Sequence, residues 1–107
     1  MDSIHSPAGA IMLASSSVDA MLKTKGFKEG AHYTRINNAV TKHIITEEMS
    51  KWAHQVRLDA NEQRHADENF VLPTEEDAKK AIDFTLALAE FLFVLPNKVT
   101  KGIEDSK

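Results

Sequence analysis

Apolar residues recur at helical spacing in the first part of the chain, between residues that typically start and stop a helix. Ser6 can cap this helix and Pro7 suits its first position, while Gly26 suits its C-terminal stop. The positions expected to face the core are Ile11, Ala14, Val18, Met21 and Leu22. The pattern therefore predicts a first helix between Pro7 and Gly26.

Two further helices are predicted in the middle of the chain. One covers about residues 31–43, and its expected inward positions are Tyr33, Ile36, Val40 and Ile44. The next begins after Thr46, a capping residue followed by Glu47 and Glu48 in the first turn, and runs to about His65. Its expected apolar stripe is Met49, Trp52 or Ala53, Val56 and Ala60, with Trp52 in the core.

A fourth helix follows the loop at residues 66–73, which we expect to fold back on the bundle through its apolar residues. Thr74 and Asp77 predict a start resembling a capping box. The expected inward stripe is Ala78, Ile82, Leu86, Ala89 and Phe93. More apolar residues widen this stripe, so the helix is either central or partly buried against another subunit. Pro96 is expected to end or bend it.

The predicted fold is a single all-α domain over residues 1–107, an antiparallel four-helix bundle with its core at about 7–99. Residues 100–107 are expected to form a short, frayed extension. Cysteine is absent, no apolar run approaches membrane-spanning length, and no export leader is evident. The expected location is the cytoplasm.

The charge distribution is uneven along the chain. The net charge of −3 argues against a general nucleic-acid binder. Residues 22–65 nevertheless carry eight Lys or Arg against five Asp or Glu, whereas residues 66–107 carry five against nine. The basic middle can face RNA or an acidic partner, or it can be an ordinary solvated surface.

The strongest candidate chemistry lies on the third predicted helix, where Arg57, Asn61 and His65 follow one another at steps of four. Arg57 can grip a phosphate, and His65 can move a proton near neutral pH. Asn61 can orient the imidazole, or it can cap the helix end. The structural alternatives are a salt bridge for Arg57 and a loop hydrogen bond for His65. Helical rise separates these two residues by about 12 Å along the axis.

Two more residues are weaker binding candidates. Arg64 can contact an RNA backbone or remain a solvated charge, and His54 can join the site or pack beside Trp52. No zinc signature, clustered carboxylate–histidine pattern or Gly-rich phosphate loop is present, so neither a metal nor a cofactor is expected.

Four segments together carry a family resemblance. They are Tyr33-Thr34-Arg35-Ile36-Asn37, Trp52-Ala53-His54-Gln55-Val56-Arg57-Leu58-Asp59-Ala60-Asn61-Glu62-Gln63-Arg64-His65, Glu75-Glu76-Asp77-Ala78 and Phe91-Leu92-Phe93-Val94-Leu95-Pro96-Asn97-Lys98-Val99. The chain resembles HEPN-like domains, and most of all a bacterial domain family of unknown function found beside or fused to restriction and other defence proteins. This resemblance covers about residues 7–99 and implies a homodimer whose two motifs face one cleft.

Two functional hypotheses follow. The first is a HEPN-like module that dimerises or docks onto a protein partner from a defence or toxin-antitoxin locus, with Arg57 and His65 in structural roles. The alternative is a metal-independent endoribonuclease with a composite Arg57/His65 site across the dimer. Ala60, where the family has Gly, and Ser15, where it has Arg, favour the module, as does the acidic balance. A small-ligand sensor is a weaker third reading.

Overall fold

A computed structural model describes residues 6–65 and 70–106 of the chain. The four long elements are α1 (Pro7–Thr24), α2 (His32–Thr41), α3 (Glu47–Arg64) and a long rod. The rod comprises α4 (Glu75–Ala89), a π-helical turn η2 (Glu90–Val94) and α5 (Leu95–Asp105). The described residues contain no strand, so the predicted all-helical class is confirmed.

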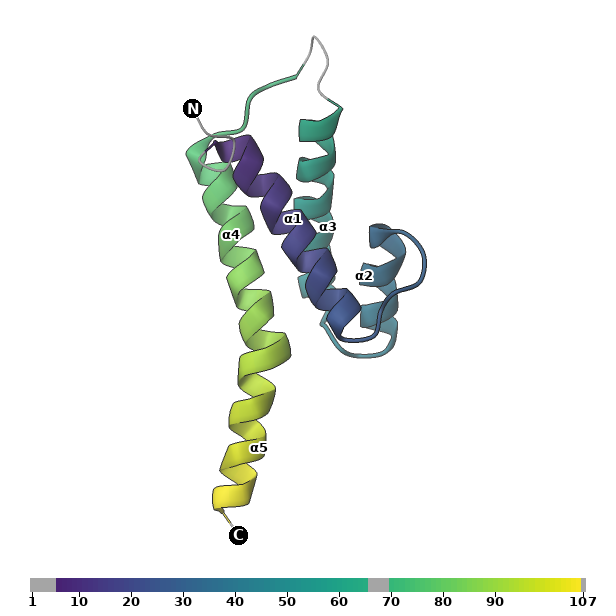
Figure 1. Cartoon of the computed structure of the whole chain (residues 1–107), viewed down its shortest axis with the longest axis vertical. Coiled ribbons are helices and arrows are strands. Elements are labelled where there is room, and N and C mark those ends of the chain that lie inside the picture. Colours follow the sequence, from purple (N-terminus) through teal and green to yellow (C-terminus); the bar gives the residue numbers. More distant parts are fainter. Residues whose placement is uncertain (1–5, 66–69, 107) are drawn as a thin grey trace.

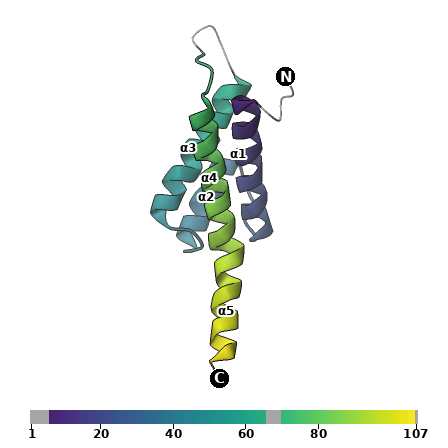
Figure 2. The ribbon, with the colours of Figure 1, turned by 90° about the vertical axis from the view of Figure 1, so that its left-hand side faces the viewer.

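The elements form a four-helix bundle from which the lower half of the rod projects (Figure 1). The predicted antiparallel order holds for α3 against its neighbours, whereas α1 and α4 run in the same direction, so that Ile11 lies near Asp77 and Lys25 near Phe93. Figure 2 shows the same projection from the side, with α4 against the other helices and α5 beyond them. The molecule is accordingly elongated, with extents of 61 × 28 × 21 Å. No helix in the described ranges is both long and apolar enough to cross a membrane.

The predicted helix starts are confirmed in detail. Ser6 accepts a hydrogen bond from the Gly9 amide at 2.9 Å, and Thr46 accepts one from the Met49 amide at 3.0 Å. Thr74 and Asp77 form a reciprocal capping box. These short polar side chains satisfy amides that have no partner within their own helix.

The core lies where α1 crosses α3 and α4. Its largest fully buried side chains are Phe84, Ile11, Leu22, Ile36, Leu88 and Val18. Of the predicted stripe of the last helix, Ala78 is buried and Phe93 packs against the core, but the prediction is wrong for Ile82 and Leu86, which are 42% and 64% exposed. The buried side is formed by Ala81 together with Phe84, Leu88 and Leu92, three of the apolar residues expected to widen the stripe.

Three other burial predictions differ from the structure. Tyr33 and Ile44 are exposed, and Ile36 and Ala39 fill the α2 side of the core. Trp52 is 42% exposed, although its ring packs against Phe84 at 5.0 Å between centroids. A large aromatic ring can cover the core edge without being enclosed by it.

The loop predicted to fold back is described only from residue 70 onward; residues 66–69 lie outside the described part. Phe70 and Pro73 are half-buried, whereas Val71 and Leu72 are strongly exposed. Residues 71–73 line a hollow against α1 and α3 but add no side chain to the buried core.

Pro96 does not end the rod. A proline ring clashes with the carbonyl four residues earlier in a regular helix and offers no amide hydrogen. The wider turn before Pro96, in which the Leu95 amide bonds the Glu90 carbonyl, accommodates it at the start of α5. The prediction of a frayed tail is therefore wrong for residues 100–105, which remain helical.

Candidate functional site

Arg57 leaves α3 on the side that faces α2. Its guanidinium carbon lies 5.1 Å from the centre of the Tyr33 ring, and its Nε donates to His54 Nδ1 at 3.3 Å. The Tyr33 and His54 rings are 4.9 Å apart and tilted by 40°. Arg57, Tyr33 and His54 therefore form one cluster, which we call the α2–α3 cluster.

Hydrogen bonds set the protonation state of His54. Its Nε2 lies 2.9 Å from Asn37 Oδ1, an acceptor, so Nε2 carries the hydrogen. Its Nδ1 accepts from Arg57 and carries none. Burial, and then the positive charge of Arg57, lower the pKa of His54. The imidazole is therefore neutral near pH 7.

Arg57 has no carboxylate within ion-pair distance among the described residues. Asp59, a nearby carboxylate on the same helix, instead accepts a hydrogen bond from Gln55 at 2.8 Å. The salt-bridge alternative for Arg57 is therefore not what the structure shows. Its half-buried guanidinium contacts a neutral imidazole and an aromatic face, both of which leave its charge unbalanced.

A second charged group lies beside this cluster and joins α1 to α2. Arg35 donates from Nε to Asp19 Oδ1 at 2.6 Å and from Nη2 to Oδ2 at 2.8 Å. Arg35 is only 8% exposed. Such a two-pronged arginine–carboxylate pair fixes both position and orientation. It ties the start of α2 to the lower half of α1.

The turn before α2 also contacts Arg35, through the backbone of Gly30. Arg35 Nη1 also donates to the Gly30 carbonyl. Gly30 has a φ of +75°, and a Cβ there would lie 3.0 Å from the Thr34 side chain. Glycine is the residue that adopts this conformation without strain.

His32 lies between the two groups. Its Nε2 is 3.9 Å from Asp19 Oδ1 and is buried, with no hydrogen-bond partner among the residues that the structure describes. Burial lowers the pKa of His32 most; Asp19 opposes this, whereas Arg35, Arg57 and His54 lower the pKa further. The α2–α3 cluster and the Asp19–Arg35 pair are thus electrostatically coupled through His32.

Several neighbours change the pKa of the Asp19 carboxyl. Burial raises the pKa of this carboxyl, but the Arg35 hydrogen bonds, His32 and Lys23 together outweigh burial and lower the pKa below its usual value. Lys23 contributes from one turn further along α1, at 3.3 Å. The carboxylate therefore remains ionised well into the acid range.

The structure does not bring Arg57 together with Asn61 and His65 in one chain. Asn61, Arg64 and His65 are exposed toward the far end of α3. His65 is the C-cap, and its amide donates to the Asn61 carbonyl at 3.1 Å. Arg57 and His65 remain separated by about 12 Å of helix axis. Of the sequence candidates, His54 is the one that contacts Arg57.

Sequence reasoning did not identify the roles of His32, Tyr33, Arg35 and Asn37. One signal was available, because Arg35 precedes Ile36 and lies four residues before Ala39, on the inward side of the predicted helix. A cation at such a position requires a buried partner. The partner, Asp19, lies sixteen residues away on another helix, which periodicity alone does not reveal.

The chemistry available to the α2–α3 cluster is that of a cation beside a neutral base. Arg57 can attract an anion, and His54 can accept or release a proton only by giving up one of its two hydrogen bonds. The described residues contain no group of three or more His, Asp or Glu side chains arranged to hold a metal ion.

Comparison with known proteins yields one family. No curated protein and no solved structure matches the chain. Residues 3–106 match the family described as Domain of unknown function (DUF4145). This match spans all the described helices and confirms the resemblance to a domain family of unknown function. The chain therefore belongs to the DUF4145 family.

Proposed function

We propose that this chain is a HEPN-like helical dimerisation and docking module of a bacterial defence or toxin-antitoxin type system. The sequence resemblance supports the HEPN-like assignment and the defence setting. The molecular part of the proposal rests on the surface of the long rod, which exposes apolar residues that the bundle does not cover.

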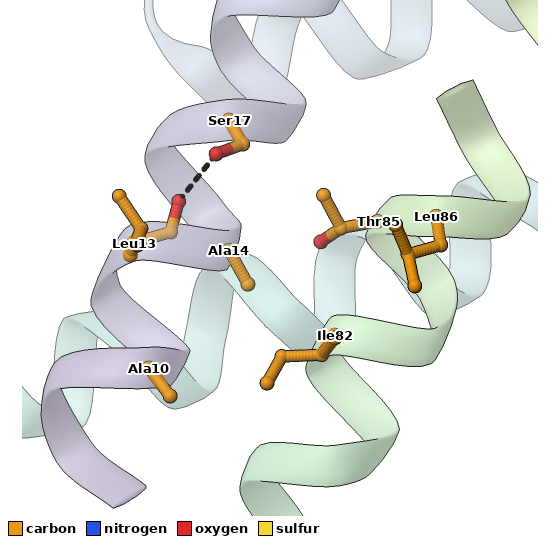
Figure 3. A pocket seen from close by; sticks show the side chains of 7 residues that line it. All are labelled: Ala10, Leu13, Ala14, Ser17, Ile82, Thr85 and Leu86. Carbon is orange, nitrogen blue, oxygen red and sulfur yellow. Dashed lines mark hydrogen bonds between the residues drawn. The ribbon is translucent and has the colours of Figure 1, made fainter. Parts of the chain in front are cut away.

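The observation that carries the proposal is an apolar groove between α1 and α4, of about 250 Å³. Figure 3 shows Ala10, Leu13 and Ala14 of α1 on one side of it, and Ile82 and Leu86 of α4 on the other. Leu13 and Leu86 are both more than half exposed. An apolar surface of this kind typically marks an interaction site.

The geometry of α3 also favours a module over a single-chain enzyme. The helix is unbroken from Glu47 to Arg64, and Ala60 is completely buried within it. No local distortion shortens the path from Arg57 to His65. The two side chains therefore do not form a catalytic pair within one copy.

We expect the wild-type chain to self-associate and a Leu86→Glu/Val99→Glu variant to be monomeric over the same concentration range. Each glutamate would have to be buried without a partner, at a cost of roughly 2 kcal/mol or more. Sedimentation equilibrium measures this difference. The matched control is Leu58→Glu/Val71→Glu, which also adds two charges at exposed apolar positions. Equal association of the wild type and the Leu86/Val99 variant would contradict docking through the rod.

The second candidate function is the metal-independent endoribonuclease, and one observation favours it. Arg57 has an unbalanced charge beside an imidazole, which suits the binding of a phosphate. In this alternative, His65 of a second copy would have to approach Arg57 to complete a composite site.

For a docking module we expect no specific RNA cleavage in EDTA by the wild type, or by the Arg57→Ala, His54→Ala and His65→Ala variants. Gel analysis of several structured and unstructured RNAs, with a dimer confirmed beforehand, tests this. Wild-type cleavage that is lost in folded Arg57→Ala and His65→Ala proteins would establish the ribonuclease and overturn the module.

A further inference from the structure

The guanidinium of Arg57 keeps two of its nitrogens free of intramolecular contacts. Its Nε donates to His54 Nδ1, and its carbon lies over the Tyr33 ring. Neither Nη1 nor Nη2 has a hydrogen-bond partner among the residues that the structure describes, and neither is one of the buried atoms that lack one. Both nitrogens are therefore accessible to solvent.

These two nitrogens form a preorganised pair of donors. Tyr33 supports the guanidinium from its face and His54 holds it at Nε, so the orientation of the remaining edge is set. Two parallel N–H groups of a planar guanidinium match the two oxygens of a carboxylate. Arg35 shows such a match in the same molecule, because two of its nitrogens bind both oxygens of Asp19. Arg57 presents a comparable fork to solvent.

The acidic residues that follow Arg57 on α3 lie on other sides of that helix. Asp59 and Glu62 are two and five residues further along the chain. These steps rotate them by roughly 200° and 140° about the helix axis from Arg57. Helix α2, which packs on the other side of the cluster, contains no Asp or Glu. The charge of Arg57 is therefore not balanced from either of the helices that form the cluster.

The acidic residues before and after the turn that leads into α2 have basic neighbours of their own. Asp19 is held in the two-pronged pair with Arg35. Glu29 lines a separate hollow together with two lysines. Burial and Arg57 lower the pKa of His54, and no carboxylate in the described ranges opposes them. The surface around Arg57 is therefore positive.

A single cation among neutral groups suits one carboxylate better than a nucleic acid. Proteins bind nucleic acids by neutralising several phosphates with several Lys or Arg side chains. The next cation on this side of α3 is Arg64, about 10 Å further along the helix axis. Tyr33 is 55% exposed, and tyrosine and arginine are both enriched at the centres of protein interfaces. These features favour an acidic side chain of a protein partner.

We propose that the α2–α3 cluster is a docking site for a protein partner, and that it recognises an Asp or Glu carboxylate in an acidic segment of that partner. The carboxylate lies in the plane of the Arg57 guanidinium and accepts hydrogen bonds from Nη1 and Nη2. The inference rests on the proposed docking function and names the chemistry of the partner. It places this contact on α2 and α3, away from the α1–α4 groove.

Selection from a random peptide library tests this chemistry without assuming a partner sequence. Short peptides displayed on phage are selected in parallel on the wild type, on Arg57→Gln and on a matched control, Lys80→Gln, at an exposed position of α4. We expect acidic residues to be enriched among peptides selected by the wild type and Lys80→Gln, but not by Arg57→Gln. No acidic enrichment, or the same enrichment on Arg57→Gln, would overturn the proposal.

Titration of the most enriched peptide, followed by fluorescence anisotropy, measures the contribution of the fork. We expect Arg57→Gln to weaken binding about tenfold, because it removes one partner of a partly desolvated charge pair. Arg57→Lys, which keeps the charge but not the fork, should recover only part of this affinity. Circular dichroism of both variants verifies that they are folded.

A double-mutant cycle identifies the contact directly. Replacing the acidic residues of the peptide by Gln or Asn should weaken binding to the wild type by a similar factor and leave binding to Arg57→Gln unchanged. Losses that simply add would show that the peptide carboxylate contacts another residue, and the assignment to Arg57 would then be wrong.

The possible outcomes separate this inference from the function on which it rests. If an oligouridine binds in an Arg57-dependent manner and no acidic peptide does, the site recognises RNA and the proposal is overturned. Acidic peptides whose binding depends on Leu86 and not on Arg57 overturn the assignment to the α2–α3 cluster, while docking through the α1–α4 groove stands. The docking function itself is overturned by specific RNA cleavage, which none of the peptide measurements reports.

Discussion

The Phe84→Ala variant is expected to lose about 3–5 kcal/mol of the free energy of unfolding, which is the usual cost of removing a buried phenyl ring. Phe84 is 1% exposed and is the largest fully buried side chain described. It comes from the helix that packs most extensively on α1, and its ring also supports Trp52 from α3. Its removal would leave a cavity at the junction of three helices.

Urea unfolding followed by circular dichroism measures this loss, with the m-value serving as a check on two-state behaviour. The matched control is Leu58→Ala, at an exposed position of α3, for which a change within about 0.5 kcal/mol is expected. Measurements at several protein concentrations separate folding from self-association. A loss below about 1 kcal/mol for Phe84→Ala would contradict the packing described here.

The Arg35→Ala variant is expected to be destabilised by about 3 kcal/mol, because it leaves the Asp19 carboxylate largely enclosed without its two-pronged partner. Lys23 and His32 remain near Asp19, which keeps the loss at the lower end of the range for broken buried pairs. The Asp19→Ala/Arg35→Ala double variant should lose less than the sum of the two single losses. Strict additivity would show that the pair does not couple α1 to α2.

We expect the stability of the folded chain to depend on pH through the same region, in a direction that follows from the pKa shifts. The pKa values of His32, His54 and Asp19 are all lowered, so the folded chain binds fewer protons than the unfolded chain. Their stabilisation is present above the unfolded pKa values and is lost as the pH falls. Stability should therefore decrease below about pH 6.5 through the histidines, and again below about pH 4 through Asp19. Arg35→Ala should reduce the second decrease, because the Asp19 pKa then moves back toward its unfolded value.

The starts of the helices could be predicted from the sequence because capping depends on residues close together in the chain. Ser6, Thr46 and Thr74 each bond an amide three residues away, so the capping residue and its target lie within one short window. Local signals do not predict which side of the last helix faces the core. That helix is apolar on several sides, and periodicity then fits the stripe through Ile82 and Leu86 as well as the buried one through Phe84 and Leu88.

The candidate site was only partly predictable, for a related reason. Arg57 could be identified as a candidate because it shares one side of its own helix with other polar residues. Its contacts with Tyr33 and its place near His32 depend on how α2 packs on α3, and that packing is fixed by long-range contacts. The contact with His54 needed only helical spacing, three residues apart, whereas the more distant His65 was ranked above it because steps of four place it on one side of the helix with Arg57 and Asn61.

The π-helical turn η2 also determines the direction in which the far end of the rod presents its side chains. A π-helical turn contains one residue more than an α-helical turn, and one residue rotates everything after it by about 100° about the helix axis. Without that residue, Val99 would be rotated by about this angle from Ile44, with which it now lines one hollow. The rotational phase of the whole outer segment is therefore encoded by a single extra residue between Glu90 and Val94.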